Sequence, residues 1–183
     1  MNIRNFSLAL ILLTGFACTS STAIDEGSER RSVRGALEQP ERQDTSKRDK
    51  GTSRGLVTDI EARTVDNDDF RRVIYTGPHL QLVLMSIPAE DHIGVETHPD
   101  VDQFFRVEEG TGEVMLGSVS KPVGPGSAVV VPAGTKHDIR TTGDKPLKLY
   151  TIYSPPHHRD GVVHHSRADA ERDTEHFDGR TTE

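Results

Sequence analysis

The sequence predicts an all-β fold, an antiparallel sandwich or barrel, on the basis of three observations. Apolar residues between Leu56 and Tyr153 come in short runs, as strands require. The runs are separated by turn clusters that contain Gly, Pro or both, such as TGPH, EEGTGE and PAGT. No convincing helical period occurs among these runs. Short strands therefore account for most of the central part of the chain.

Eight strands are expected in this region. They cover residues 71–76, 80–87, 94–98, 103–107, 112–117, 127–131, 137–141 and 147–153. The residues expected in the core are Val83, Met85, Ile87, Val129, Val131, Leu147 and Leu149. After the strands, Ser166 with Asp169 three residues later predicts the capped start of a short polar helix.

Residues 1–17 have the pattern of an export signal. Arg4 supplies the positive start, the apolar run FSLALILL is too short to span a bilayer, and small residues lead up to Ala17. Cys18, the single cysteine, follows directly, where a bacterial lipoprotein signal places its lipidated cysteine. The alternative is ordinary cleavage after Ala17. Both alternatives predict an exported protein of the bacterial cell envelope or periplasm, and a lipid anchor at Cys18 would be its only contact with the membrane.

Residues 18–55 are expected to form a disordered tether. No aromatic residue occurs between Phe16 and Phe70, and this stretch is dense in charges of both signs, so it cannot bury a core. The net charge of -7, with basic residues interleaved among acidic ones, argues against nucleic acid as a partner. The remainder divides into a β-domain over 56–156 and a His-rich polar tail over 157–183.

The segment GSAVVVPAGTKHDIRT resembles the second motif of the cupin superfamily. It has Gly126, Pro132, Gly134 and His137 at the spacing of that motif, and Thr141 stands where Asn is usual. The residues explain the motif physically, because Pro132 and Gly134 make a tight reversal that aims His137 inward. The resemblance implies a cupin-type jelly-roll β-barrel.

The first cupin motif is then expected in GVETHPDVDQFFRVEEG, in altered form. Counting back from Gly110 places Gln103 where the family usually has Glu. A gap of four residues before Gln103 places Glu96 and His98 at the positions of the family's histidine pair. Residues 96 and 98 would lie on one face of a strand, so both side chains could reach one ion.

Two departures accompany this alignment. The leading Gly of the motif falls on Glu90, and a rival register would use His98 with Asp100. The rival leaves only two residues before Gln103, so the first register is preferred. Asp100 and Asp102 are expected to be turn and solubility residues.

The resemblance implies a divalent metal ion held by Glu96, His98, Gln103 and His137. Because one imidazole of the usual three is replaced by a carboxylate, Fe or Mn is favoured over copper, and Zn or Ni is a further candidate. Two histidines and one carboxylate are the ligand set of many non-haem Fe(II) oxygenases, with Gln103 as a weak fourth ligand or a hydrogen-bonding neighbour. The alternative is a cupin without metal, in which Glu96 and Gln103 solvate a polar barrel mouth.

Two features outside the motifs leave alternatives open. The pairs His157 with His158 and His164 with His165 would each offer at most one ligand to a site, because adjacent residues of an extended chain face opposite sides. They are expected to form a lip over the barrel mouth or a solvated tail. An outward Phe104 would serve a homodimer interface, which cupins commonly use, or pack beneath the N-terminal segment.

Two functions follow from this sequence. The chain is also similar to small single-domain cupins described as mannose-6-phosphate-isomerase-like, but a sugar-phosphate site needs inward basic residues, and Arg106 and Lys148 are expected to face outward. One candidate is an exported metal-dependent enzyme, an oxygenase, isomerase or decarboxylase that acts on a small molecule. The other is a non-catalytic module that captures a small molecule or a metal at the cell envelope. Open coordination positions facing a lined pocket would favour the enzyme.

Overall fold

The structure is a computed structural model that describes residues 54–183. The expected export signal, Cys18 and most of the expected tether lie outside the described residues. The elements are α1 (Ile60–Val65), β1 (Arg71–Thr76), β2 (Gln81–Ile87), β3 (Asp102–Glu109), β4 (Gly112–Leu116), β5 (Val119–Val123), β6 (Ala128–Val131), β7 (His137–Thr141), β8 (Leu147–Ser154), β9 (Val163–His164) and α2 (Arg167–Arg172). None of the described helices has the length and hydrophobicity needed to cross a membrane.

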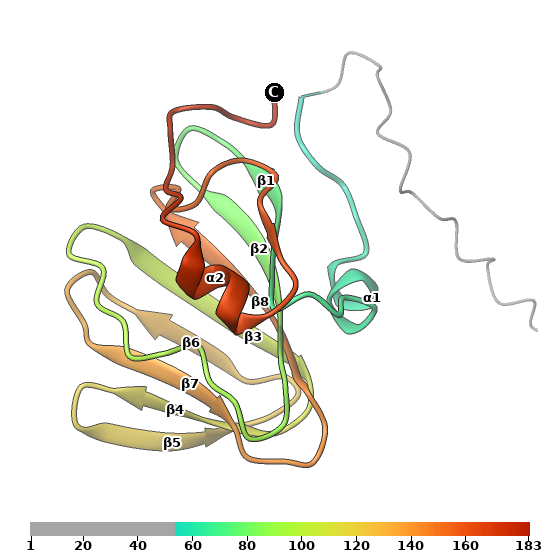
Figure 1. The fold of residues 1–183 in the computed structure, drawn as a ribbon, viewed down its shortest axis with the longest axis vertical. Coiled ribbons are helices and arrows are strands. Elements are labelled where there is room, and N and C mark those ends of the chain that lie inside the picture. Colours follow the sequence, from blue (N-terminus) through green and yellow to red (C-terminus); the bar gives the residue numbers. More distant parts are fainter. Residues whose placement is uncertain (1–53) are drawn as a thin grey trace, which may run out of the picture. The chain divides into compact units, whose positions relative to one another are not determined.

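Antiparallel strands build two sheets, which confirms the all-β prediction (Figure 1). The larger sheet has the order β6-β3-β8-β2-β1-β9 and the smaller has the order β5-β4-β7. Buried side chains of both sheets form one hydrophobic core, to which Phe105 and Leu149 contribute from the larger sheet and Val114 and Ile139 from the smaller. All seven residues expected in the core are buried there. This arrangement is that of a jelly roll, as predicted.

The segment that joins β2 to β3 does not form the expected strand over 94–98. It runs beside β7 and pairs with it only at two isolated bridges, His92 with Arg140 and Glu96 with His137. Four positions separate the two residues on this segment and three separate their partners, so one residue bulges out. Gly94, with φ of 99°, supplies the backbone conformation that this bulge requires.

Three short elements were not predicted. Strand β5 includes Lys121 and Pro122, which belong to an expected turn cluster; it lies at the edge of the smaller sheet, where a proline costs no ladder hydrogen bond. Helix α1 is only 6 residues long and begins after Asp59, whose side chain accepts a hydrogen bond from the Ala62 backbone N–H. Strand β9 has two residues. Elements of this length carry too few residues to display a period.

The outer face of the larger sheet is partly covered by the chain that precedes β1. Lys148 lies on this face, and its Nζ donates to the carbonyl oxygen of Asn67 and, at 2.8 Å, to the carboxylate of Asp68. Phe104 is half-buried, and its ring centroid lies 6.2 Å from that of Tyr150. Helix α2 begins at Ser166 with the predicted capping box, in which Ser166 and Asp169 each bind the backbone of the other.

Thr141, at the position where cupins usually have Asn, anchors the start of the segment that carries Glu96. Its hydroxyl donates to the carbonyl oxygen of Ile87 at 3.0 Å, and its backbone N–H donates to that of Asp91 at 2.9 Å. The variant Thr141→Val would leave the buried Ile87 carbonyl without this donor. We expect it to lower the free energy of unfolding by about 1–2 kcal/mol in urea denaturation.

The matched control is Thr142→Val, because Thr142 is the exposed neighbour on the same strand end. Its effect is expected to stay within about 0.5 kcal/mol. Equal losses in the two variants would contradict the role assigned to the Thr141 hydroxyl.

Candidate metal centre

Two backbone hydrogen bonds place Glu96 directly opposite His137. The N–H of each residue donates to the carbonyl oxygen of the other, both at 2.9 Å. Residues paired in this way project their side chains to the same face of a sheet, so both point into the interior. The carbonyl oxygen of His98 also accepts a hydrogen bond from Gly134 at 2.7 Å, which ties the segment to the turn before β7. The two sequence motifs are therefore joined through their backbones.

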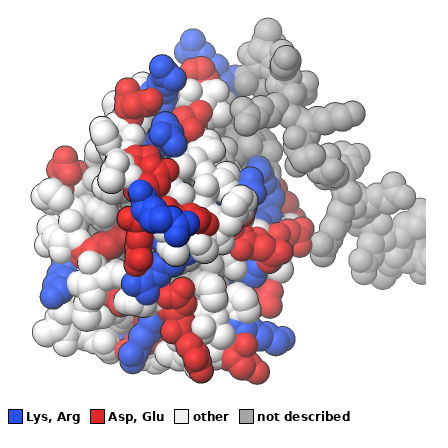
Figure 2. Space-filling view, in the orientation of Figure 1, with Lys and Arg blue, Asp and Glu red and all other residues white. Residues whose placement is uncertain are grey.

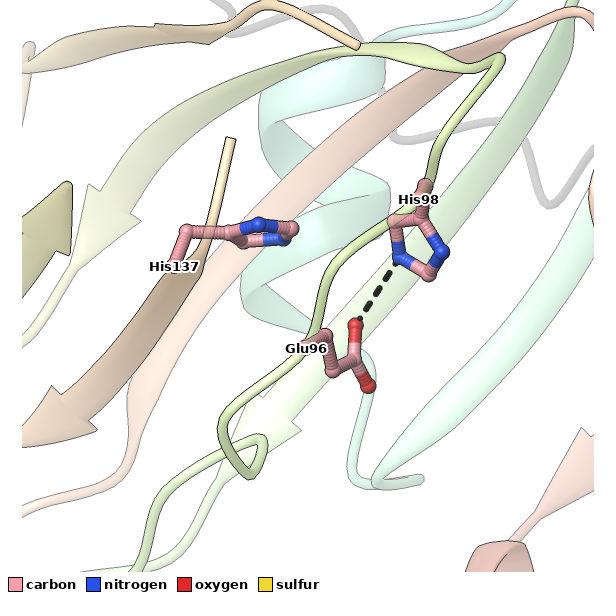
Figure 3. A group of neighbouring side chains, drawn as sticks. All are labelled: Glu96, His98 and His137. Carbon is pink, nitrogen blue, oxygen red and sulfur yellow. Dashed lines mark hydrogen bonds and ion pairs between the residues drawn. The ribbon is translucent and has the colours of Figure 1, made fainter. Parts of the chain in front are cut away.

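Glu96, His98 and His137 bring three potential ligand atoms within 4.8 Å of one another (Figure 3). The Nε2 atom of His98 lies 3.1 Å from Oε2 of Glu96. His137 is fully buried, whereas Glu96 and His98 remain partly accessible. Asp100, the ligand of the rival register, is exposed and outside this group. The structure thus assembles the predicted triad in the preferred register.

Gln103 lies beside the third ligand and is almost fully buried. Its Oε1 is 3.1 Å from Nε2 of His137, and its Nε2 donates to the hydroxyl of Thr151 at 3.1 Å. The Nδ1 atom of His137 lies 2.9 Å from the carbonyl oxygen of Thr135, which can only accept, so Nδ1 carries the proton. In the neutral imidazole Nε2 then holds a lone pair. This is the tautomer of a histidine that binds metal through Nε2.

Within two pairs of these atoms, the spacing is that of neighbouring ligands of one ion. Ligands about 2.1 Å from an ion and at right angles to each other lie about 3.0 Å apart. The pairs His98 with Glu96 and His137 with Gln103 are each separated by 3.1 Å. With Nδ1 protonated, Nε2 of His137 and Oε1 of Gln103 are both acceptors, and a cation bound by both would attract each of them. Nitrogen and oxygen donors in this ratio suit Fe, Mn, Zn or Ni.

Glu96 is held in its charged form by its surroundings. Burial alone would raise its pKa, but the hydrogen bond with His98 and the positive charge of Arg71 outweigh burial and hold the pKa below its ordinary value. Arg71 lies at the start of β1, with Nη2 3.9 Å from Oε1 of Glu96. A carboxylate ready to bind a cation without first losing a proton suits a metal ligand.

A cavity of about 250 Å³ opens beside the triad. Its lining combines Glu96 and His98 with Arg71 from β1, His157 and His158 from the segment after β8, and residues of α2 and beyond. The ring of His157 lies 4.3 Å from that of His98 and stacks on Tyr153 at 5.6 Å. The first histidine pair of the C-terminal segment therefore lies at the cavity, as a lip would.

Burial sets the protonation of the aromatic groups around this cavity. It lowers the pKa of His157 to about 4, with nearby His158 and His98 adding to the effect, so His157 is neutral at pH 7. Burial also raises the pKa of Tyr153 above its ordinary value, so its hydroxyl keeps its proton.

Glu175 fastens the C-terminal segment over the cavity. Its carboxylate accepts hydrogen bonds from Nδ1 of His158 and from the backbone N–H of Arg159, both at 2.6 Å. Burial would raise the pKa of Glu175, but these two bonds lower it to about 2. Because the folded-state pKa is depressed from 4.5, the stabilisation is complete above pH 4.5 and is lost as the pH falls towards 2.

We expect Glu175→Gln to lower the free energy of unfolding at pH 7 by about 1.5–3 kcal/mol, the usual range for hydrogen bonds to a charged group. The difference from the parent should shrink as the pH is lowered from 4.5 to 2, and urea titrations across this range measure it. The control is Glu171→Gln, whose exposed ion pair with Arg167 contributes less than about 1 kcal/mol. A Glu175 effect that does not change with pH would contradict this assignment.

The candidate ligands come together as expected, whereas other residues of the site were not predicted. Asp102 has the expected structural role, because its carboxylate accepts a hydrogen bond from the backbone of Ala133 at 2.8 Å. Arg71 and Tyr153 at the site were not singled out. Strand alternation could have indicated both residues. Arg71 lies two residues before the inward-facing Val73, and Tyr153 lies four residues after the inward-facing Leu149, so each shares the inner face of its strand.

The fold and the triad define a cupin with a candidate metal centre. The Cupin domain family matches residues 83–153, which include both motifs. Together with the close relatives that follow, this match shows that the chain belongs to the cupin superfamily.

Close relatives occur in bacteria and in a giant virus. The chain is 47% identical over 121 residues to YrkC of Bacillus subtilis, across 63% of this chain and 65% of YrkC, so it spans slightly less than two thirds of that protein. It is 42% identical over 111 residues to L612 of Acanthamoeba polyphaga mimivirus, across 58% of this chain and 69% of L612. The crystal structure of BH2720 from Bacillus halodurans is similar with a TM-score of 0.65 and 46% identity, across 67% of this chain and 97% of that one.

Proposed function

We propose that the protein is a metal-dependent enzyme that acts on a small molecule, with Glu96, His98, His137 and Gln103 holding one Fe or Mn ion. The observation that carries this proposal is the triad of ligand atoms within 4.8 Å of one another beside a lined cavity. A divalent ion there would supply a Lewis acid or a redox centre, as oxygenases, isomerases and decarboxylases need. An accessible cavity favours a catalytic metal site over a closed, purely structural one.

The chain's own residues would prepare the cavity for chemistry. His137 is oriented by Thr135, and Gln103 by Thr151, so two ligands keep their positions before a metal binds. Tyr153 retains its proton in its buried position, while His157 is neutral and able to accept a hydrogen bond from a bound molecule. The segment held by Glu175 would limit the access of water to the site.

Turnover tests the proposal directly. Protein loaded with Fe(II) or Mn(II) would be incubated with a panel of small molecules, while dissolved oxygen and released carbon dioxide are followed. We expect metal-dependent turnover that Glu96→Gln abolishes. Stoichiometric metal and saturable ligand binding without turnover would favour the binding module at the cell envelope.

The role of Gln103 can be tested by restoring the usual acid of the family. Gln103→Glu would add a second carboxylate to the buried group that contains Glu96. With metal, we expect tighter binding, by about 10-fold, since a charged oxygen replaces a neutral one. Without metal, we expect lower thermal stability than in the parent, because two like charges would share one buried site. Unchanged metal affinity and apo stability would place Gln103 outside the coordination shell.

We also propose export and lipid anchoring at Cys18, supported by the signal-like residues 1–17 and the position of the cysteine directly after Ala17. Incorporation of labelled palmitate into the parent but not into Cys18→Ser, in a bacterial host, would support the anchor. Secretion of an unlabelled protein that begins at Cys18 would support ordinary cleavage.

A further inference from the structure

Arg71 is a buried cation in the wall of the cavity. It is the first residue of β1, and its side chain is only 10% exposed. It lines the same cavity as Glu96 and His98. Burying a guanidinium group is costly unless its N–H groups find acceptors, so its partners decide whether it is structural.

The guanidinium of Arg71 makes no hydrogen bond to the part of the chain that the structure describes, and its one ion pair there, with Glu96, is long. Its Nε is buried and has no hydrogen-bond partner within residues 54–183. Its nearest carboxylate, Glu96, is 3.9 Å away, beyond hydrogen-bond distance, and its Cζ lies 5.9 Å from the centroid of the Phe70 ring. Arg71 therefore has N–H groups that its protein surroundings leave unused, next to a cavity.

The other charged groups around the cavity are already paired. Arg167 lies 3.0 Å from the carboxylate of Asp91 and 2.8 Å from that of Glu171. Glu175 is bonded to His158. Figure 2 shows basic and acidic side chains interleaved on the face that carries α2, with no extended area of either sign. Arg167 is held by two carboxylates at 3.0 and 2.8 Å, whereas Arg71 has a single ion-pair partner at 3.9 Å, so Arg71 is the less fully paired of the two cations in the lining.

Metal binding would increase the need for an anion. Glu96 is the carboxylate nearest to Arg71, and it is also a proposed metal ligand. A divalent ion bound by Glu96 would engage that carboxylate and so weaken the one ion pair that Arg71 makes among the described residues. An anionic group of a bound molecule would replace Glu96 as the partner of the Arg71 guanidinium.

We propose that Arg71 binds the carboxylate of a small anionic substrate. Another oxygen atom of the same substrate molecule would face Glu96, His98 and His137. This inference rests on the proposed function, because it names the substrate class of that site. The planar guanidinium matches a carboxylate with two parallel hydrogen bonds. The cavity, at about 250 Å³, lies below the about 300–1,000 Å³ of pockets for drug-sized ligands, so the substrate has few atoms. Nearby acids such as Glu171 and Asp173 disfavour a doubly charged phosphate.

Glycolate and its neutral amide, glycolamide, are matched probes for this inference. Calorimetric titrations of the Mn(II)-loaded full chain would compare the two, with metal content measured on the same samples. We expect glycolate to bind at least about 10-fold more tightly than glycolamide. In Arg71→Gln this preference should fall by about 10-fold or more, until the two probes bind about equally, because the charge-assisted hydrogen bonds are lost. Arg71→Lys keeps the charge without the planar fork and should retain part of the preference.

The matched control is Arg72→Gln, the same change at the next residue of β1. Arg72 has a side chain that is 42% exposed, is paired with Asp69 and lies outside the cavity lining. It should leave the preference unchanged, and thermal unfolding checks that all variants fold. If Arg71→Gln alters metal affinity or stability but not the preference, Arg71 is a structural counter-ion of Glu96 and the inference is overturned, while the proposed function stands. Tighter binding of phosphate than of glycolate would overturn the carboxylate assignment. Absence of metal from the parent would overturn both proposals.

Discussion

Glu96→Gln is expected to reduce metal affinity by more than about 100-fold, because losses of outer partners alone cost about 10- to 100-fold and this change removes a charged ligand. The substitution preserves the size of the side chain, so the fold should survive. His137→Ala should also lose the metal, and it removes the ligand that is fully buried. Element analysis by plasma mass spectrometry on the purified protein would measure about one equivalent of Fe or Mn in the parent and near zero in both variants.

Asp100→Asn is the control for this prediction. Asp100 is exposed in the same segment and belongs to the rival register of the motif. The Asp100→Asn variant should therefore retain the metal. Metal lost in Asp100→Asn but kept in Glu96→Gln would show that the register is wrong. If the parent contains no metal even after reconstitution, Glu96 and Gln103 are pocket residues and not metal ligands.

Gly110→Ala is expected to cause the largest loss of stability among single substitutions in the motifs, about 3 kcal/mol or more. Gly110 has φ of 84°, where an L-residue is strained by about 1–2 kcal/mol. An added Cβ would also lie 2.4 Å from the carbonyl oxygen of Pro146 and 2.9 Å from Cα of Leu147. Relief of this overlap requires a backbone shift, which typically lowers the free energy of unfolding by a further amount of about 1–3 kcal/mol. Urea denaturation measures the sum.

Gly117→Ala separates the two contributions. Gly117 also has a positive φ, of 59°, but an added Cβ there would meet nothing within 4 Å. We therefore expect this control to lose only about 1–2 kcal/mol. Similar losses at the two glycines would mean that the close approach of Pro146 to Gly110 does not contribute.

The first half of the metal site shows where local patterns suffice and where they fail. The register that selects Glu96, His98 and Gln103 depends on spacing alone, and the structure brings these residues together with His137. The expected strand over 94–98 was wrong, although its two candidate ligands, Glu96 and His98, do lie beside His137. An alternating pattern describes any extended chain, whereas a regular ladder also needs a partner in register, and the bulge at Gly94 breaks that register.

The sequence by itself determined the all-β class, the core positions and the ligand motifs, because each follows from the period of a strand or from spacing within a turn. Only the tertiary structure decided that Arg71 would be buried beside Glu96 and that His157 and His158 would line the cavity. These placements depend on long-range packing: β9 pairs with β1, and Glu175 bonds back to His158. Burial of a charged side chain is set by which distant segment covers it, and no local period encodes that choice.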